Sequence, residues 1–221
     1  MTTPPPPVGA SPFSELVGRL DGLGGPIPDV SAAQLAWPAR KHPSAILALL
    51  TEDVTPELLF TERAETLRRH PGEVSFPGGR IDPGDTGPED AALREASEEV
   101  GVDPRGVTLL GRLPATRVIS SFNATIVVGT WDGLQPLVPE PGEVAQVLRY
   151  PVDLLASHEV RHMSRLVNGH SGPAFVIDDI VIWGFTAHLV DWLLDLGGWR
   201  LDWDESQVVE VPRRFWRHRP A

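Results

Sequence analysis

The sequence contains no cysteine. A disulfide framework, a thiolate metal site and a cysteine nucleophile are therefore excluded, and thiols give no indication of the redox compartment. No apolar run reaches the length of about 18 residues that a membrane-spanning helix needs, so we expect no membrane association. The hydrophobic fraction of 41% is nevertheless sufficient for a core, and the length of 221 residues favours one domain.

Targeting signals are also missing. The N-terminal stretch MTTPPPPVGASP lacks both the basic region and the apolar region of a secretory signal. The C-terminal Arg-Pro-Ala differs from a peroxisomal address. We therefore expect a cytoplasmic protein, with residues 1–12 disordered because a proline run has little to bury.

Basic residues are fewer than acidic ones, 19 against 30, and the net charge of −11 argues against nucleic acid as the main partner. Residues 63–80 are a local exception. Four arginines there face two glutamates, a local sum of +4 − 2 = +2: Arg63, Arg68, Arg69, Arg80, Glu65 and Glu73. This segment could hold an anionic group.

Residues 88–100 are predicted to form a helix. Pro88 suits a helix start, because its missing N–H would have no partner there. Glu89 and Asp90 place negative charge in the first turn, where the helix dipole favours it. Gly101 can end the helix in a left-handed conformation.

The predicted helix has an apolar face formed by Leu93, Ala96 and Val100. Three carboxylates share another face, within a wedge of about 100°: Glu95, Glu98 and Glu99. Like charges three and four residues apart destabilise a helix. One interpretation is a solvated acidic face on which Arg94 pairs with Asp90 and Glu98. The other is a site for a divalent cation, because clustered hard oxygen ligands suit Mg²⁺ or Mn²⁺.

Residues 94–102, REASEEVGV, resemble the C-terminal half of the Nudix box, G-x5-E-x7-R-E-U-x-E-E-x-G-U. The box is altered at Asp85, which replaces glutamate and lies one residue farther from Arg94 than the pattern allows. This variant resembles the coenzyme A diphosphatase branch of the Nudix hydrolases. The branch has an upstream signature, LL-x-T-x-R-[SA]-x3-R-x3-G-x3-FPGG, which residues 63–79 match completely. The resemblance covers roughly residues 43–195.

The resemblance implies an α/β fold, a Nudix α/β/α sandwich with a mixed β-sheet and a loop-helix-loop catalytic box. It also implies one to three Mg²⁺ or Mn²⁺ ions, held by Glu95, Glu98, Glu99 and the carbonyl of Gly79. Arg94 would orient the carboxylates. The general base stays open between Glu95, Glu98 and Glu143.

Substrate contacts are predicted in the basic segment and the turn that follows it. Arg63, Arg68 and His70 would hold phosphates, because the arginine fork binds phosphate oxygens in pairs. Phe76 and Gly78 belong to a turn whose two glycines allow a close approach of the backbone. Two other interpretations remain open for the basic segment: a solvated loop, or an ion pair between Arg63 and the acidic helix.

The implied reaction is metal-dependent hydrolysis of coenzyme A or its thioesters to 3′,5′-ADP and 4′-phosphopantetheine or its acyl form. The partner is then a small-molecule nucleotide. One alternative is another nucleoside diphosphate, such as ADP-ribose or NADH. A second is a non-catalytic ligand sensor on the same fold, which the presence of all three glutamates and Arg94 disfavours.

The remaining pattern predicts a proline-rich segment over residues 1–25, a Nudix domain over 26–200 and a tail over 201–221. Strands are predicted at 45–50, 57–63, 107–113, 124–130, 144–150, 174–177 and 180–182, and helices at 13–23, 151–156 and 186–196. Residues 117–123 should border the substrate. The aromatic, basic tail could dock on a partner subunit in a homodimer, cover the core, or fray.

Residues 158–162, HEVRH, spell the zinc-protease motif HExxH. That motif needs a helix, which brings both histidines to one face. The run 158–167 has no helix cap and follows a short turn; if it is a strand, the two histidines lie about 13 Å apart. A shared zinc ion is therefore not expected.

Overall fold

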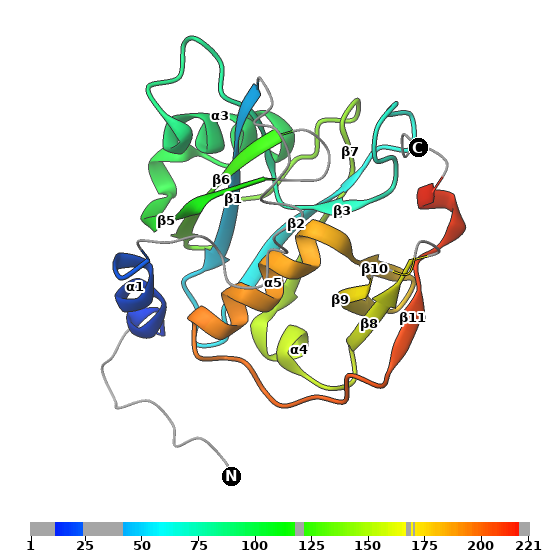
Figure 1. The fold of residues 1–221 in the computed structure, drawn as a ribbon. Helices are drawn as coiled ribbons and strands as arrows, with labels where there is room; N and C mark the ends of the chain where they lie inside the picture. The colour runs from blue at the N-terminus through cyan, green and yellow to red at the C-terminus, as the bar shows by residue number, and fades with distance from the viewer. Residues whose placement is uncertain (1–11, 24–41, 118–121, 167–168, 170, 217–221) are drawn as a thin grey trace.

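The structure is a computed structural model and describes residues 12–23, 42–117, 122–166, 169 and 171–216. It contains two β-sheets and several helices (Figure 1). Residues 1–11, residues 24–41, and residues 118–121 of the segment expected to border the substrate lie outside the described residues.

The larger sheet has seven strands. Their bounds are β1 His42–Thr51, β2 Glu57–Arg63, β3 Val74–Ser75, β4 Gly78–Arg80, β5 Thr108–Arg117, β6 Phe122–Trp131 and β7 Val144–Pro151. The order is β3-β2-β1-β6-β5, with β4 paired to β1 and β7 paired to β2. Strands β1 and β6 run parallel, whereas β1 and β2 run antiparallel. The sheet is therefore mixed, as predicted.

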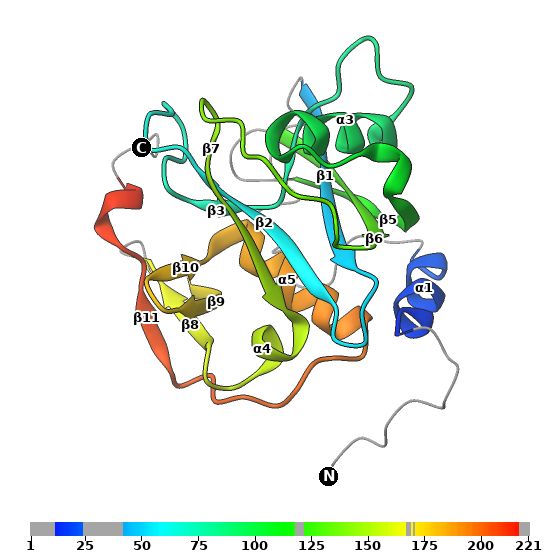
Figure 2. The same ribbon diagram turned by 180° about the vertical axis from the view of Figure 1, so that it is seen from behind.

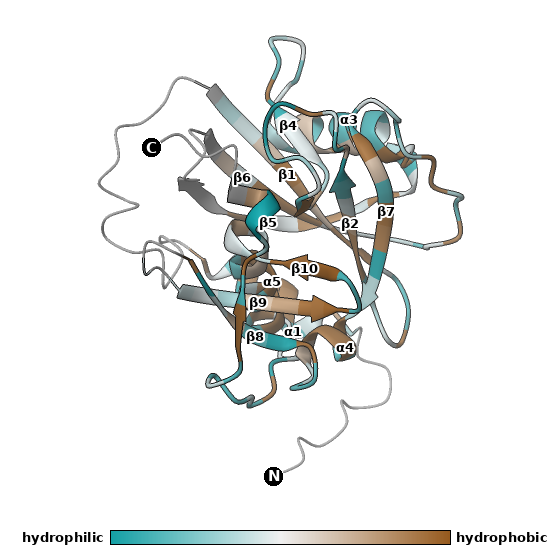
Figure 3. Ribbon diagram, turned by 90° about the vertical axis from the view of Figure 1, so that its right-hand side faces the viewer, coloured by the Kyte–Doolittle hydropathy of each residue, from teal (hydrophilic) through white to brown (hydrophobic). Residues whose placement is uncertain are grey.

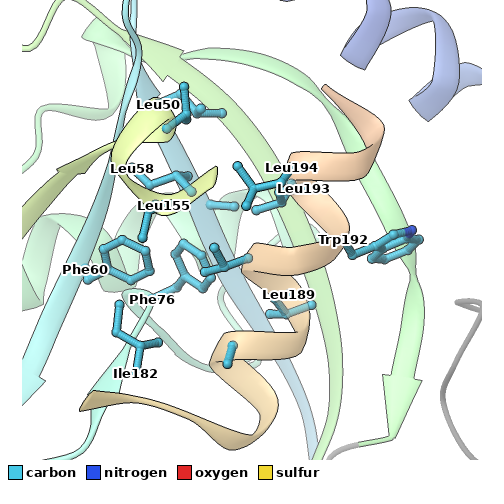
Figure 4. Close-up of a cluster of buried hydrophobic side chains, with 14 of the residues drawn as sticks. Leu50, Leu58, Phe60, Phe76, Leu155, Ile182, Leu189, Trp192, Leu193 and Leu194 are labelled. Carbon is cyan, nitrogen blue, oxygen red and sulfur yellow. The ribbon is translucent and has the colours of Figure 1, made fainter. Parts of the chain in front are cut away.

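Both faces of this sheet are covered, which explains the uninterrupted apolar run in β1. Side chains alternate between the faces of a strand. Leu47 and Leu49 accordingly pack with helix α3, Pro88–Val100, whereas Ala48 and Leu50 pack in the core that contains helix α5, Gly184–Leu196. Figure 4 shows side chains of α5 facing Leu50 and Leu58 of the sheet. The predicted α/β/α sandwich is confirmed.

Helix α3 has the bounds predicted from the sequence. Gly101 ends it in the left-handed conformation, with φ 75°, and its N–H donates to the carbonyl of Ser97 at 3.0 Å. Helix α5 begins two residues before its predicted start and contributes a wide buried stripe that includes Leu189, Leu193 and Leu196. The catalytic box thus lies on a helix that is packed firmly against the central strand.

The smaller sheet has four strands in the order β10-β9-β8-β11. Their bounds are β8 Arg161–Arg165, β9 Ser171–Ile177, β10 Ile180–Ile182 and β11 Val208–Glu210. Hydrophobic residues mark β9 and β10 (Figure 3), and Phe175 and Ile182 complete the core around α5. Residues 158–160 of the HExxH stretch form a turn, and Arg161 and His162 begin β8, so the stretch lacks the helix that a zinc-protease motif needs.

Both ends of the described chain pack on this body. Helix α1, Ser14–Asp21, buries Leu16 and Leu20, and the short helix α4 spans Val152–Ala156. The tail forms β11, which pairs in parallel with β8, and a 3₁₀ turn, η2, over Arg213–Trp216. A second 3₁₀ turn, η1, spans Pro104–Gly106. The tail therefore covers part of the core as far as residue 216, and a frayed tail is wrong for that part.

None of the described helices is long and apolar enough to cross a membrane.

Candidate active site

The Gly78-Gly79 turn lies directly against strand β1. A Cβ atom at Gly78 would stand 2.4 Å from the carbonyl oxygen of Ala45 and 2.8 Å from Cα of Ile46. No side chain fits at such distances, so the close approach of the two backbones requires glycine. Leu47 donates its N–H to the carbonyl of Pro77 at 2.9 Å, which fixes the turn to the strand.

Phe76 anchors the same turn from inside the protein. Its side chain is 4% exposed and stacks on Phe60 with the ring centroids 4.7 Å apart (Figure 4). The prediction that Phe76 contacts the substrate is therefore wrong for its side chain, because the ring is enclosed in the core. In the sequence, an aromatic residue beside two glycines is compatible both with a ring buried in the core and with a ring that contacts the substrate.

Glu95 lies over the turn. A Cβ atom at Gly79 would stand 2.4 Å from the carboxyl group of Glu95, so the missing side chain provides the space that this carboxylate occupies. Burial is the main cause that raises the pKa of Glu95, against the opposing effect of Arg94. The repulsion from Glu98 and Glu143 adds to the increase.

Glu99 is the most buried of the three box carboxylates. Its side chain accepts a hydrogen bond from the N–H of Gly78 at 3.3 Å, and the residue is 5% exposed. Burial raises the pKa of Glu99 to about 8, the charge of Arg63 lowers it, and Glu95 and Glu143 raise it further. The charges of two carboxylates on α3 and of Glu143, a distant residue in the chain, therefore act on one another.

Arg94 braces this site through five hydrogen bonds. Its guanidinium donates to both carboxylate oxygens of Asp85, at 2.9 and 3.0 Å, and to the carbonyl of Arg80 at 2.9 Å. It also donates to Glu95 at 3.0 Å and to Glu98 at 2.9 Å. The hydrogen bond from Arg94 lowers the pKa of Asp85. Asp85, the altered position of the box, thus links the loop before α3 to the helix through Arg94.

Glu98 lies at the rim, because its side chain is 61% exposed and bonded to Arg94. The i,i+4 pair between Arg94 and Glu98 expected for a solvated face is therefore present. The predicted pair between Arg94 and Asp90 is replaced. Asp90 accepts a hydrogen bond from the N–H of Thr86 at 3.0 Å, and Arg94 donates to Asp85 instead.

Within the described part of the chain, no three His, Asp or Glu side chains stand together as a ready-formed metal site. Glu98 bonds Arg94, whereas Glu95 and Glu99 lie at the glycine turn. The donor set still fits Mg²⁺ or Mn²⁺, which prefer carboxylate and carbonyl oxygens. A cation would also offset the repulsion from neighbouring carboxylates, which adds to the effect of burial in raising the pKa values of Glu95 and Glu99.

The basic segment starts at the same site. Among the described residues, the Nε of Arg63 is buried and has no hydrogen-bond partner, and the charge of Arg63 lowers the pKa of Glu99. Arg68 and Arg69 are exposed. His70 contacts a carboxylate oxygen of Glu73 through Nδ1 at 3.0 Å. The segment therefore presents two arginines to solvent.

Comparison with known proteins agrees with this geometry. The model of the NUDIX domain matches residues 40–167. A protein of Pectobacterium atrosepticum named uncharacterized Nudix hydrolase NudL is 34% identical over 154 residues, which cover 68% of this chain and 80% of that protein. A protein of the same name from Salmonella paratyphi B is 33% identical over 170 residues, covering 73% and 88%.

Solved structures are also similar to this chain. The Nudix hydrolase RenU from M. Smegmatis is 25% identical with a TM-score of 0.45, over 52% of this chain and 73% of that one. DR0079 from Deinococcus radiodurans is 16% identical with a TM-score of 0.47, over 74% and 88%. The family model and the relatives carry the assignment, because the model spans more than half of the chain. The chain belongs to the Nudix hydrolase family, enzymes that act on phosphorus-containing anhydrides.

Proposed function

We propose that the protein hydrolyses the diphosphate bond of coenzyme A or its thioesters, releasing 3′,5′-ADP and 4′-phosphopantetheine or its acyl form. The observation that supports hydrolysis is the position of Glu95 and Glu99 at the glycine turn, with Arg94 bracing the helix. The match of residues 63–79 to the upstream signature supports coenzyme A as the substrate.

Glu95, Glu98, Glu99 and the carbonyl of Gly79 would hold Mg²⁺ or Mn²⁺. When bound, these ions stabilise charge on phosphoryl oxygens and make water more acidic. Arg94 keeps Glu95 and Glu98 in place from behind, through its hydrogen bonds to both.

Water would displace a phosphate in line, without a covalent enzyme intermediate. We assign acceptance of its proton to Glu143, because this residue is exposed, its charge contributes to the raised pKa values of Glu95 and Glu99, and it lies outside the box that would hold the ions. Glu95 and Glu98 are the other candidates for the base. The exposed Arg68, with His70 beside it, would bind the additional 3′-phosphate of coenzyme A, because an arginine fork pairs with phosphate oxygens.

The test is incubation of the full chain with a panel of nucleotides and Mg²⁺ or Mn²⁺, followed by chromatography of the products. Equimolar 3′,5′-ADP and 4′-phosphopantetheine from coenzyme A is the expected result. A higher kcat/KM with ADP-ribose or NADH would reject the substrate but keep the reaction. Absence of turnover with every compound would leave the ligand sensor.

A cytoplasmic location and a homodimer remain predictions from the sequence. Light scattering on the purified protein measures the second directly.

A further inference from the structure

We infer that Gln135 is a positioning residue, which holds Glu143 against the carboxylates of α3 through residues 135–143, here called the strap. The inference rests on the proposed role of Glu143 as proton acceptor. The strap follows β6 and leads into β7, and the chain between these strands passes beside α3 (Figure 2).

The side chain of Gln135 clasps the end of the catalytic helix. Its Nε2 donates to the carbonyl of Gly101 at 2.5 Å, and its Oε1 accepts from the N–H of Asp103 at 2.9 Å. Gly101 is the residue that ends α3. A carboxamide can donate and accept at the same time, which neither a carboxylate nor an aliphatic side chain can do.

The backbone of the strap continues the attachment. Val138 donates its N–H to the carbonyl of Val100 at 3.0 Å, and Glu140 donates to the carbonyl of Glu99 at 2.8 Å. These carbonyls belong to the last turn of α3, whose C=O groups have no partner within a helix. The strap therefore satisfies the end of the helix that carries the box carboxylates.

Three prolines stiffen the strap, at positions 136, 139 and 141. Proline has no N–H and a fixed φ. The N–H groups of Val138 and Glu140, which bond the helix, stand between these prolines. Restricted φ angles also reduce the entropy that the chain loses on ordering. In a stiff strap, a displacement at Gln135 also moves the far end.

The far end of the strap carries Glu143. The carbonyl of Glu140 accepts from the N–H groups of Glu143, at 3.1 Å, and Val144, at 2.8 Å, which closes a turn. The carbonyl of Glu143 then accepts from the N–H of Ala64 at 2.9 Å. Glu143 is thereby held between the end of α3 and the start of the basic segment.

The experiment is a double-mutant cycle of Gln135→Leu with Glu143→Gln, measured as kcat and KM for coenzyme A. Gln135→Leu removes both hydrogen bonds of the side chain at similar volume. We expect it to lower kcat by about 10–100-fold, the usual effect of losing a group that orients an active-site residue, with KM nearly unchanged. In the Glu143→Gln background, the same change should have no further effect.

Two comparisons keep the result specific. Gln146→Leu makes the same change at an exposed position of β7, and should behave as wild type. Gln135→Glu keeps the acceptor for Asp103, and its kcat should lie between those of wild type and Gln135→Leu.

A second measurement is amide hydrogen exchange in the metal-free protein. The exchange rates at Val138, Glu140 and Glu143 should rise by about tenfold or more in Gln135→Leu, with the rates in β1 unchanged. This exchange measurement also decides the matter if the leucine variant has too little activity to assay.

Independent, additive losses from the two substitutions would overturn the inference, as would wild-type kcat in Gln135→Leu or unchanged exchange in the strap. Wild-type kcat in Glu143→Gln would overturn it together with the role of Glu143. None of these outcomes would contradict metal-dependent hydrolysis itself, because the nucleotide panel tests the reaction separately.

Discussion

A methyl group at position 79 should separate activity from stability. In Gly79→Ala the new Cβ would lie 2.4 Å from the carboxyl group of Glu95. Carbon contacts become favourable at about 3.5 Å, so the carboxylate has to move by about 1 Å. A displacement of that size in an active site can cost about 10²-fold in rate, and we expect a decrease in kcat of this order. The carbonyl of residue 79 remains in the variant.

The fold should tolerate this change, because the atoms that must move are at the end of a flexible side chain. A side chain forced away from its rotamer costs about 0.5–1.5 kcal/mol, and this is the expected loss in the free energy of unfolding. Gly78→Ala is the matched control. Its Cβ would meet the backbone of Ala45 at 2.4 Å, which the central strand cannot relieve, so about 3 kcal/mol or more should be lost.

The assay is urea unfolding of both variants, with kcat for coenzyme A measured at saturating Mg²⁺ well below the unfolding transition. A kcat of Gly79→Ala within about threefold of wild type would contradict the expected displacement of the Glu95 carboxylate. A loss of stability in Gly79→Ala as large as that in Gly78→Ala would contradict the difference between the two contacts.

Three further predictions concern the box. Arg94→Lys keeps the charge but loses the paired hydrogen bonds to Asp85, so kcat should fall by about 10–100-fold; unchanged steady-state kinetics would contradict the bracing role. Glu98→Gln should abolish turnover, and the temperature of thermal unfolding should stay near that of wild type because the side chain is 61% exposed. A near-wild-type kcat with Mg²⁺ would contradict the role of Glu98 as a metal ligand. In metal-free buffer, burial holds the pKa of Glu99 at about 8 rather than 4.5, so the folded state binds this proton more tightly than the unfolded chain. The free energy of unfolding should therefore fall as pH rises from about 4.5 to about 8. Denaturant titrations of Glu99→Gln should show a smaller fall, and an identical slope would exclude Glu99 as its source.

Short-range patterns in the sequence were enough for the elements of the site. Pro88, the acidic first turn and Gly101 act within a few residues of the helix ends, so the bounds of α3 could be predicted from them. The apolar run in β1 and its alternation between two cores likewise follow from local hydrophobicity. The spacing of Arg94, Glu95, Glu98 and Glu99 also placed these residues on one helix.

Contacts between distant segments decided what each residue does. The burial of Glu99 depends on the turn at Gly78, which lies 21 residues away in the chain. Phe76 became part of the core because β2 brings Phe60 beside it. Gln135 carries no motif, and its partners are 32 and 34 residues away. Such pairings depend on which surfaces fold together, and no local pattern records them.

Propensity, capping and motif spacing are properties of neighbouring residues, so helix α3, the apolar strand β1 and the family of this protein could be predicted without the fold. Burial and hydrogen-bond partners, in contrast, arise from packing between segments that are remote in the chain. That packing distinguishes the buried Glu99 from the exposed Glu98, joins Asp85 to Arg94 and attaches the strap to the end of α3.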